Sequence, residues 1–120
     1  MSKKILMVED ELDIREAVRA SLKSRGYRVV LAADGEEGLR KVKSEKPDLV
    51  LLDITMPKVD GWQMLRAIRN DEATRDLPVV MLTANRTTAS LIESQSQKAN
   101  DYLMKPFDIE QLMTFINRYI

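Results

Sequence analysis

Five short apolar runs, separated by stretches of helical periodicity, constrain the fold of this chain more than any other feature of its sequence. The runs occupy residues 5–8, 29–33, 49–52, 79–82 and 102–104. Continuous apolar runs of this length are typical of strands that are buried on both faces, as in a parallel sheet. Each run ends at a polar or turn-forming residue, so the sequence predicts five short strands.

Helical patterns fill the stretches between these runs. Their apolar faces are formed by Ile14, Ala17, Val18, Ser21 and Leu22, by Leu39 and Val42, by Trp62, Leu65 and Ile68, and by Leu112, Phe115, Ile116 and Tyr119. Gly26 is a typical residue after a helix end, and Asp108 a typical N-cap. A further helix is expected over 87–98, although polar residues interrupt its apolar face. Arg66 and Arg69 are predicted to lie on a solvated helix face, where they could pair with Asp71, Glu72 or Asp76.

This alternation of strand and helix predicts an α/β fold. Strand–helix–strand connections are right-handed and place helices on both faces of a parallel sheet. We therefore predict a doubly wound, five-stranded parallel sheet of order 2-1-3-4-5 with five helices, which is the flavodoxin-like topology. The 120 residues are expected to form a single domain, spanning residues 1–120.

Composition excludes several classes of function. The chain has 19 basic and 19 acidic residues, so its net charge of zero gives no reason to expect direct binding to nucleic acid or to an anionic membrane. It has no cysteine and no histidine, which excludes thiolate chemistry, serine–histidine triads and histidine metal sites. The first apolar run is too short for a signal peptide or a membrane span, so we expect a cytoplasmic protein.

Polar residues with chemical potential follow four of the five predicted strands. Glu9 and Asp10 follow the first, Asp53 the third, Thr83 the fourth and Lys105 the fifth. Parallel strands have their carboxyl ends at one edge of the sheet, and open α/β sheets bind ligands there. Taken singly, each residue has a structural explanation, as a helix cap, a turn former or a solvated charge. Independent roles do not account for their shared position.

Three carboxylates at one edge would repel one another unless a cation lay between them. Magnesium suits such a site because it binds one or two carboxylates and keeps water positions for a phosphate. Lys105 could pair with Asp53 or with a phosphoryl oxygen, and Thr83 could donate its hydroxyl to the same oxygen. An ionised carboxylate needs no general base, so these groups are suited to phosphoryl transfer to Asp53.

These motifs resemble those of bacterial response-regulator receiver domains, in the CheY-like superfamily of two-component signalling. The resemblance rests on Glu9-Asp10, on Asp53-Ile-Thr-Met-Pro57 with Asp60-Gly61, on Thr83-Ala84, and on Asp101-Tyr-Leu-Met-Lys105-Pro-Phe107. It implies that Asp53 is the phosphoacceptor and that Lys105 binds the phosphoryl group. Magnesium would be bound by Glu9, Asp10, Asp53 and the backbone carbonyl of Thr55.

The resemblance also implies a switch. Thr83 matches the switch hydroxyl, Tyr102 matches the switch aromatic, and the Lys105–Pro106 peptide bond is expected to be cis. Thr55 and Asn85 stand where side chains gate the dephosphorylation of the aspartyl phosphate. Lys98 stands where the family usually has a glycine.

The partners implied are those of a phosphorelay. A sensor histidine kinase or a histidine phosphotransfer protein would phosphorylate Asp53, and a downstream effector protein or domain would detect the change. Such a domain catalyses its own phosphorylation and dephosphorylation without being a conventional enzyme.

Two other functions are compatible with parts of the sequence. A pseudo-receiver would use the same fold as an interaction module without phosphorylation. A phosphatase of the haloacid dehalogenase type also uses an aspartyl nucleophile, but that family carries it on the first strand within Asp-x-Asp. A flavodoxin-like mononucleotide site is disfavoured, because the acids at 9–11 would repel a phosphate.

Overall fold

A computed structural model describes residues 2–54, 60–83 and 99–120 of the chain. Five strands form one parallel sheet in the order β2-β1-β3-β4-β5. They are β1 (Lys4–Val8), β2 (Arg28–Ala32), β3 (Leu49–Asp53), β4 (Val79–Thr83) and β5 (Asp101–Met104). The predicted strand order is confirmed, and the strand ends differ from the predicted ones by one residue at most.

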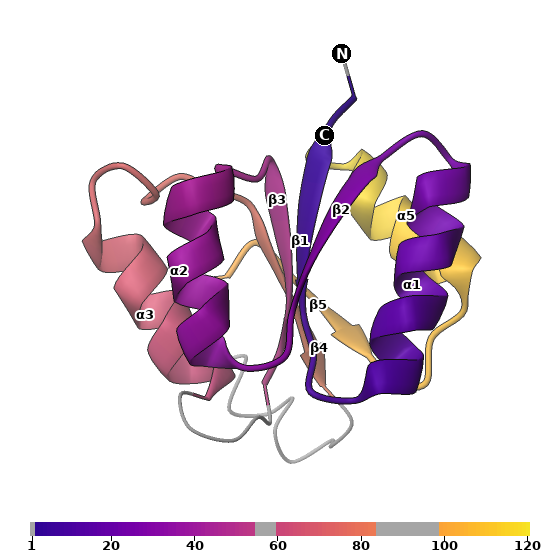
Figure 1. Cartoon of the computed structure of the whole chain (residues 1–120), viewed down its shortest axis with the longest axis horizontal. Helices are drawn as coiled ribbons and strands as arrows, with labels where there is room; N and C mark the ends of the chain where they lie inside the picture. The colour runs from indigo at the N-terminus through magenta and orange to yellow at the C-terminus, as the bar shows by residue number, and fades with distance from the viewer. Residues whose placement is uncertain (1, 55–59, 84–98) are drawn as a thin grey trace.

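Helices cover both faces of this sheet, as Figure 1 shows: α2 and α3 lie on one side, α1 and α5 on the other. They are α1 (Leu12–Ser24), α2 (Gly35–Glu45), α3 (Gly61–Asn70) and α5 (Ile109–Asn117). Five helices were predicted, whereas the described part of the chain contains four. The remaining one, expected over 87–98, falls outside the described residues.

The central strands explain why the apolar runs are continuous. Successive side chains of a strand point to opposite faces of the sheet. In β1, Ile5 and Met7 join the core beneath α1 and α5, whereas Leu6 and Val8 join the core beneath α2 and α3. All four are fully buried. Because both faces are covered, no polar residue can alternate with them, and polar chemistry is confined to the strand ends.

Local sequence signals determine where the helices begin and end. Asp34, Asp60 and Asp108 cap α2, α3 and α5, each accepting a hydrogen bond from a backbone N–H in the first turn. The prediction for Asp108 is thus confirmed. Gly26 follows α1 with a φ of +93°, a left-handed conformation that glycine adopts without steric cost. None of the helices within the described ranges is long and apolar enough to cross a membrane.

The prediction for Arg69 is only partly right: the side chain is half-buried, and Asp76, one of its predicted partners, lies close enough to influence its pKa. Its guanidinium donates hydrogen bonds to the carbonyls of Arg75 and Leu77 and to the side chain of Asn100, at 2.7–3.0 Å. Asn100 also accepts a hydrogen bond from the backbone N–H of Val79. Arg69 therefore joins the end of α3 to the starts of β4 and β5, and burial lowers its pKa.

Candidate functional site

The backbone brings the predicted site residues to one edge of the sheet. Just beyond the ends of strands, Glu9 N–H donates to the carbonyl of Ala32 and Lys105 N–H to that of Thr83. Asp53 ends β3 and pairs in register with Leu82, the residue before Thr83. The sheet thus fixes the backbone at each of these positions, so the side chains start from defined positions along one edge.

Three acids converge at this edge. Glu9, Asp10 and Asp53 each offer a carboxylate oxygen, and these oxygens lie within 4.8 Å of one another. Glu9 is fully buried and Asp53 is 6% exposed, while Asp10 is exposed to solvent. Carboxylates this close repel one another, and oxygen ligands are those that hard divalent cations prefer. The residues therefore fit a magnesium-sized ion that is reached from solvent on the Asp10 side.

Lys105 is the cation of this cluster. Its Nζ lies 3.1 Å and 3.0 Å from the two carboxylate oxygens of Glu9, and 3.6 Å from Oδ1 of Asp53. The first two contacts are hydrogen bonds, whereas the third is an ion pair that is too long for one. We expected Lys105 to pair with Asp53 or with a phosphoryl group. Its closer partner is Glu9, and Asp53 is second.

Burial controls the protonation of this pair. Desolvation raises the pKa of Glu9 from its ordinary 4.5 to about 7, although the hydrogen bond from Lys105 opposes the rise. Desolvation lowers the pKa of Lys105, but the hydrogen bond to Glu9 and the charge of Asp53 outweigh it, so the net pKa is raised. Lys105 therefore remains a cation, and the charge of Glu9 depends on the nearby cations.

The start of α3 lies directly against Asp53. Gly61 N–H donates to the carbonyl of Ile54 at 3.0 Å. A Cβ at position 61 would lie 2.5 Å from the carbonyl oxygen of Asp53 and 2.7 Å from the Cα of Ile54. Both contacts are far inside van der Waals distance, so the absence of a side chain at Gly61 permits this packing. The Asp60-Gly61 motif therefore shapes the backbone behind Asp53.

Arg15 is a site neighbour that the sequence analysis missed. From the fourth position of α1 it donates to the carbonyl of Glu9 at 2.9 Å and to that of Asp10 at 3.3 Å. One signal was available. A cation in the first turn of a helix opposes the helix dipole, so its presence there suggests a compensating contact.

Comparison with known proteins identifies this arrangement. Residues 5–117 match the family described as response regulator receiver domain. The chain belongs to this family. It is 41% identical over 113 residues to response regulator MprA of Mycobacterium ulcerans, covering 94% of this chain and 48% of that protein. It is 44% identical over 110 residues to the probable transcriptional regulator ycf27 of Cyanophora paradoxa, covering 92% and 45%. The chain thus spans about half the length of these relatives.

Solved structures of related proteins superpose closely on the chain. The chemotaxis protein CheY4 of Vibrio cholerae superposes with a TM-score of 0.91 at 32% identity, and both chains are fully covered. The receiver domain of the sensor histidine kinase PA1611 from Pseudomonas aeruginosa gives a TM-score of 0.89 at 35% identity, with 99% and 98% of the chains covered. That structure holds a magnesium ion in its active-site cleft. The acid cluster of the present chain is of the kind that binds such an ion.

The remaining predicted receiver residues are only partly described. Thr83 is 3% exposed and ends β4. Tyr102 is half-buried against the core beneath α2 and α3, and its buried hydroxyl has no hydrogen-bond partner within the described ranges. The Lys105–Pro106 peptide bond is cis, as the family resemblance implied. Thr55 and Asn85 lie outside the described residues, and so does Lys98.

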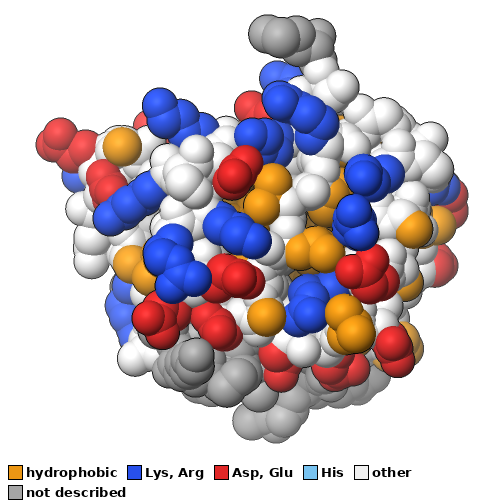
Figure 2. Space-filling model, in the orientation of Figure 1, with side chains coloured by type: hydrophobic (Ala, Val, Ile, Leu, Met, Phe, Trp, Pro, Cys, Tyr) orange, Lys and Arg blue, Asp and Glu red, His pale blue; other side chains and the backbone are white. Residues whose placement is uncertain are grey.

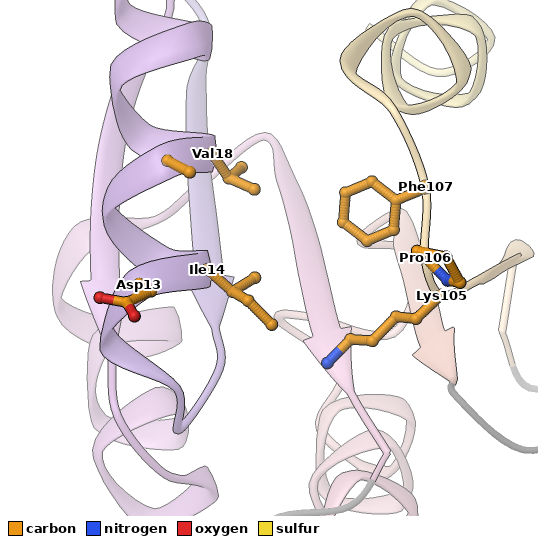
Figure 3. A pocket seen from close by; sticks show the side chains of 7 residues that line it. Asp13, Ile14, Val18, Lys105, Pro106 and Phe107 are labelled. Carbon is orange, nitrogen blue, oxygen red and sulfur yellow. The ribbon is translucent and has the colours of Figure 1, made fainter.

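A groove of about 550 Å³ lies beside the receiver site, between α1 and the segment that follows β5. Figure 3 shows Ile14 and Val18 of α1 on one side and Phe107 on the other, with the Lys105 side chain extending along the groove. The lining is mainly apolar, and Lys105 links it to the acid cluster. A molecule in this groove would lie next to the acids.

Proposed function

We propose that Asp53 accepts a phosphoryl group and that residues 1–120 act as one receiver domain. The convergence of the Glu9, Asp10 and Asp53 oxygens, with Lys105 beside them, is the observation that carries this proposal. A carboxylate nucleophile needs charge neutralisation more than it needs a base, and this cluster supplies cationic and cation-binding groups.

In the transfer step, a carboxylate oxygen of Asp53 attacks the phosphorus of a phosphohistidine. The P–N bond breaks, the imidazole leaves with its electron pair, and an acyl phosphate forms on Asp53. Lys105 needs to move only slightly from Glu9 to reach the new phosphoryl oxygens, because its Nζ already lies 3.6 Å from Asp53. Thr83 would donate its hydroxyl to one of those oxygens.

The metal ligands in this proposal are Glu9, Asp10, Asp53 and the backbone carbonyl of Thr55. Magnesium, when bound, would neutralise these acids and the developing charge on the phosphoryl oxygens. The buried carboxylate of Glu9 would hold the ion from the sheet side, and the exposed Asp10 from the solvent side. Because Glu9 would then share its charge between two cations, Lys105 becomes freer to turn toward Asp53.

Signalling would follow from a shift between two conformations. Movement of Thr83 toward the phosphoryl group would let Tyr102 swing inward. In the present structure the Tyr102 hydroxyl is buried without a hydrogen-bond partner among the described residues, which costs free energy that a second conformation would recover by supplying one. We place the control of dephosphorylation at Thr55 and Asn85, and the readout in a downstream effector protein or domain.

The phosphodonor in this proposal is a sensor histidine kinase or a histidine phosphotransfer protein in the cytoplasm. The apolar groove along Ile14, Val18 and Phe107 gives such a protein a surface next to Lys105. A protein bound there would bring its phosphohistidine to the solvent side of the acid cluster, where Asp10 is exposed.

Incubation with acetyl phosphate and magnesium, followed by intact-mass measurement, tests the proposal without a cognate kinase. The wild type should gain one phosphoryl group, and chelation of magnesium should prevent the gain. Asp53→Asn should gain none, whereas Glu72→Gln, a change of an exposed acid that follows α3, should behave as wild type. A wild type that gains no phosphoryl group and binds no beryllofluoride would refute the function. Equal labelling of Asp53→Asn would refute the acceptor.

A further inference from the structure

We propose that Arg15 is a positioning residue for the acid pair. Its guanidinium holds the backbone carbonyls of Glu9 and Asp10, so that both carboxylates point toward Asp53 and can bind a divalent cation together. This inference rests on the proposed function, because it assumes that the acid cluster binds such a cation.

The first argument is how the loop between β1 and α1 is held. Of the helices in the described ranges, α2, α3 and α5 begin with an aspartate that caps a backbone N–H. The residue at the same position of α1 is Glu11, whose side chain makes no capping hydrogen bond. Arg15 reaches back across this junction instead, with hydrogen bonds of 2.9 Å and 3.3 Å to the two carbonyls. It therefore ties the helix to the acid pair.

The second argument is how backbone orientation sets the ligands. Glu9 N–H is fixed by the carbonyl of Ala32 at 3.1 Å, the last contact that β2 gives to this strand. Beyond it, the peptide planes after Glu9 and Asp10 determine where the carboxylates point. The two carbonyls that define those planes are the acceptors of Arg15. Without these bonds the exposed Asp10 would turn more freely toward water.

Charge and positioning predict opposite results, which makes the proposal testable. A guanidinium bonded to the backbone of two of the acids repels an incoming cation, so its removal on electrostatic grounds alone would tighten magnesium binding. Its removal as a positioning group would weaken binding. Mutation of a group that orients metal ligands typically lowers metal affinity by about 10–100-fold. Positioning should therefore outweigh the lost repulsion, and the sign of the change decides between them.

The experiment is a calorimetric magnesium titration of the whole chain, with four variants. Arg15→Met should bind magnesium at least about tenfold more weakly than wild type. Arg15→Lys retains the positive charge and offers an ammonium donor in place of the guanidinium, so it should recover part of the loss. Arg19→Met is the matched control, because Arg19 lies one turn further along α1 and, among the described residues, forms its hydrogen bond and ion pair with Glu16, at 3.2 Å. It should bind magnesium as wild type does. Asp10→Asn measures the magnesium affinity that remains when one carboxylate ligand is lost.

A second readout separates positioning from general loss of structure. For Arg15→Met, the magnesium concentration that gives half-maximal labelling by acetyl phosphate should rise, while the rate at saturating magnesium recovers toward that of wild type. Unchanged or tighter magnesium binding by Arg15→Met would refute this inference alone. Failure of the wild type to bind magnesium would refute the proposed function, and the inference with it.

Discussion

Gly61→Ala is a single-methyl test of how α3 supports Asp53, the proposed phosphoacceptor. The added Cβ would lie 2.5 Å from the carbonyl oxygen of Asp53 and 2.7 Å from the Cα of Ile54. Both obstacles are backbone atoms, which cannot rotate away as a side chain can. The backbone that carries Asp53 must therefore move by about an ångström to restore normal contact distances.

Two magnitudes follow from this displacement. Overpacking of this kind costs about 2 kcal/mol of stability, which lowers the melting temperature of a domain of this size by about 8 °C. Misplacement of a reacting group by about an ångström lowers the rate of a positioned reaction by about 100-fold. We expect Gly61→Ala to lose both stability and phosphorylation rate.

The assay combines thermal unfolding with a time course of labelling by acetyl phosphate. Gly38→Ala is the matched control. Its Cβ would lie 2.9 Å from the terminal carbon of Met64, a flexible side-chain end that can give way, and 3.1 Å from Cγ2 of Val8, where a shift of a few tenths of an ångström is enough. It should label at the wild-type rate. Wild-type stability and labelling in Gly61→Ala would refute the reasoning. An equal loss of labelling rate in both variants would also refute it, because it would show that overpacking at either position, and not displacement of Asp53, lowers the rate.

Three further predictions concern the charged groups. Because the pKa of Glu9 in the ion-free fold is about 7 against 4.5 ordinarily, the folded state binds the proton more tightly. Its contribution to stability is complete below pH 4.5 and is lost as the pH rises through about 7, by at most about 3 kcal/mol. Urea unfolding across this range should show the decline in wild type and not in Glu9→Gln. Lys105→Met removes a cation that competes for Glu9, so calorimetry should show magnesium binding tighter by about tenfold, with phosphorylation by acetyl phosphate much slower; weaker magnesium binding would contradict this. Arg69→Met should lower the free energy of unfolding by about 3 kcal/mol without changing magnesium affinity, whereas exposed Arg66→Met should change neither.

Much of the fold could be predicted because burial determines the pattern of apolar residues in the sequence. Strands covered on both faces must be apolar at every position, so the three central strands appear as uninterrupted runs. The caps were readable for a similar reason, since Asp108 satisfies backbone groups only a few residues away. The apolar face of 87–98 is interrupted by polar residues and gives a weaker prediction, and that segment lies outside the described residues.

The hydrogen bonds of two arginines, Arg69 and Arg15, could not be predicted in the same way. Arg69 was expected in solvent because helical spacing cannot reveal that carbonyls from another segment surround it. Arg15 was missed because its acceptors are backbone atoms, which every residue carries and which therefore leave no signature in the sequence.

The position of acids, a hydroxyl and a lysine at one edge of a parallel sheet could be derived from the sequence alone. Strand order and direction are sufficient for that conclusion, because parallel strands end together. Which charged group contacts which is visible only in the folded structure. Lys105 bonds to Glu9 at 3.0 Å and lies 3.6 Å from Asp53, although 96 positions separate it from Glu9 in the chain. Differences of half an ångström between distant loops depend on how the helices pack against the sheet, and no local pattern of residues encodes them.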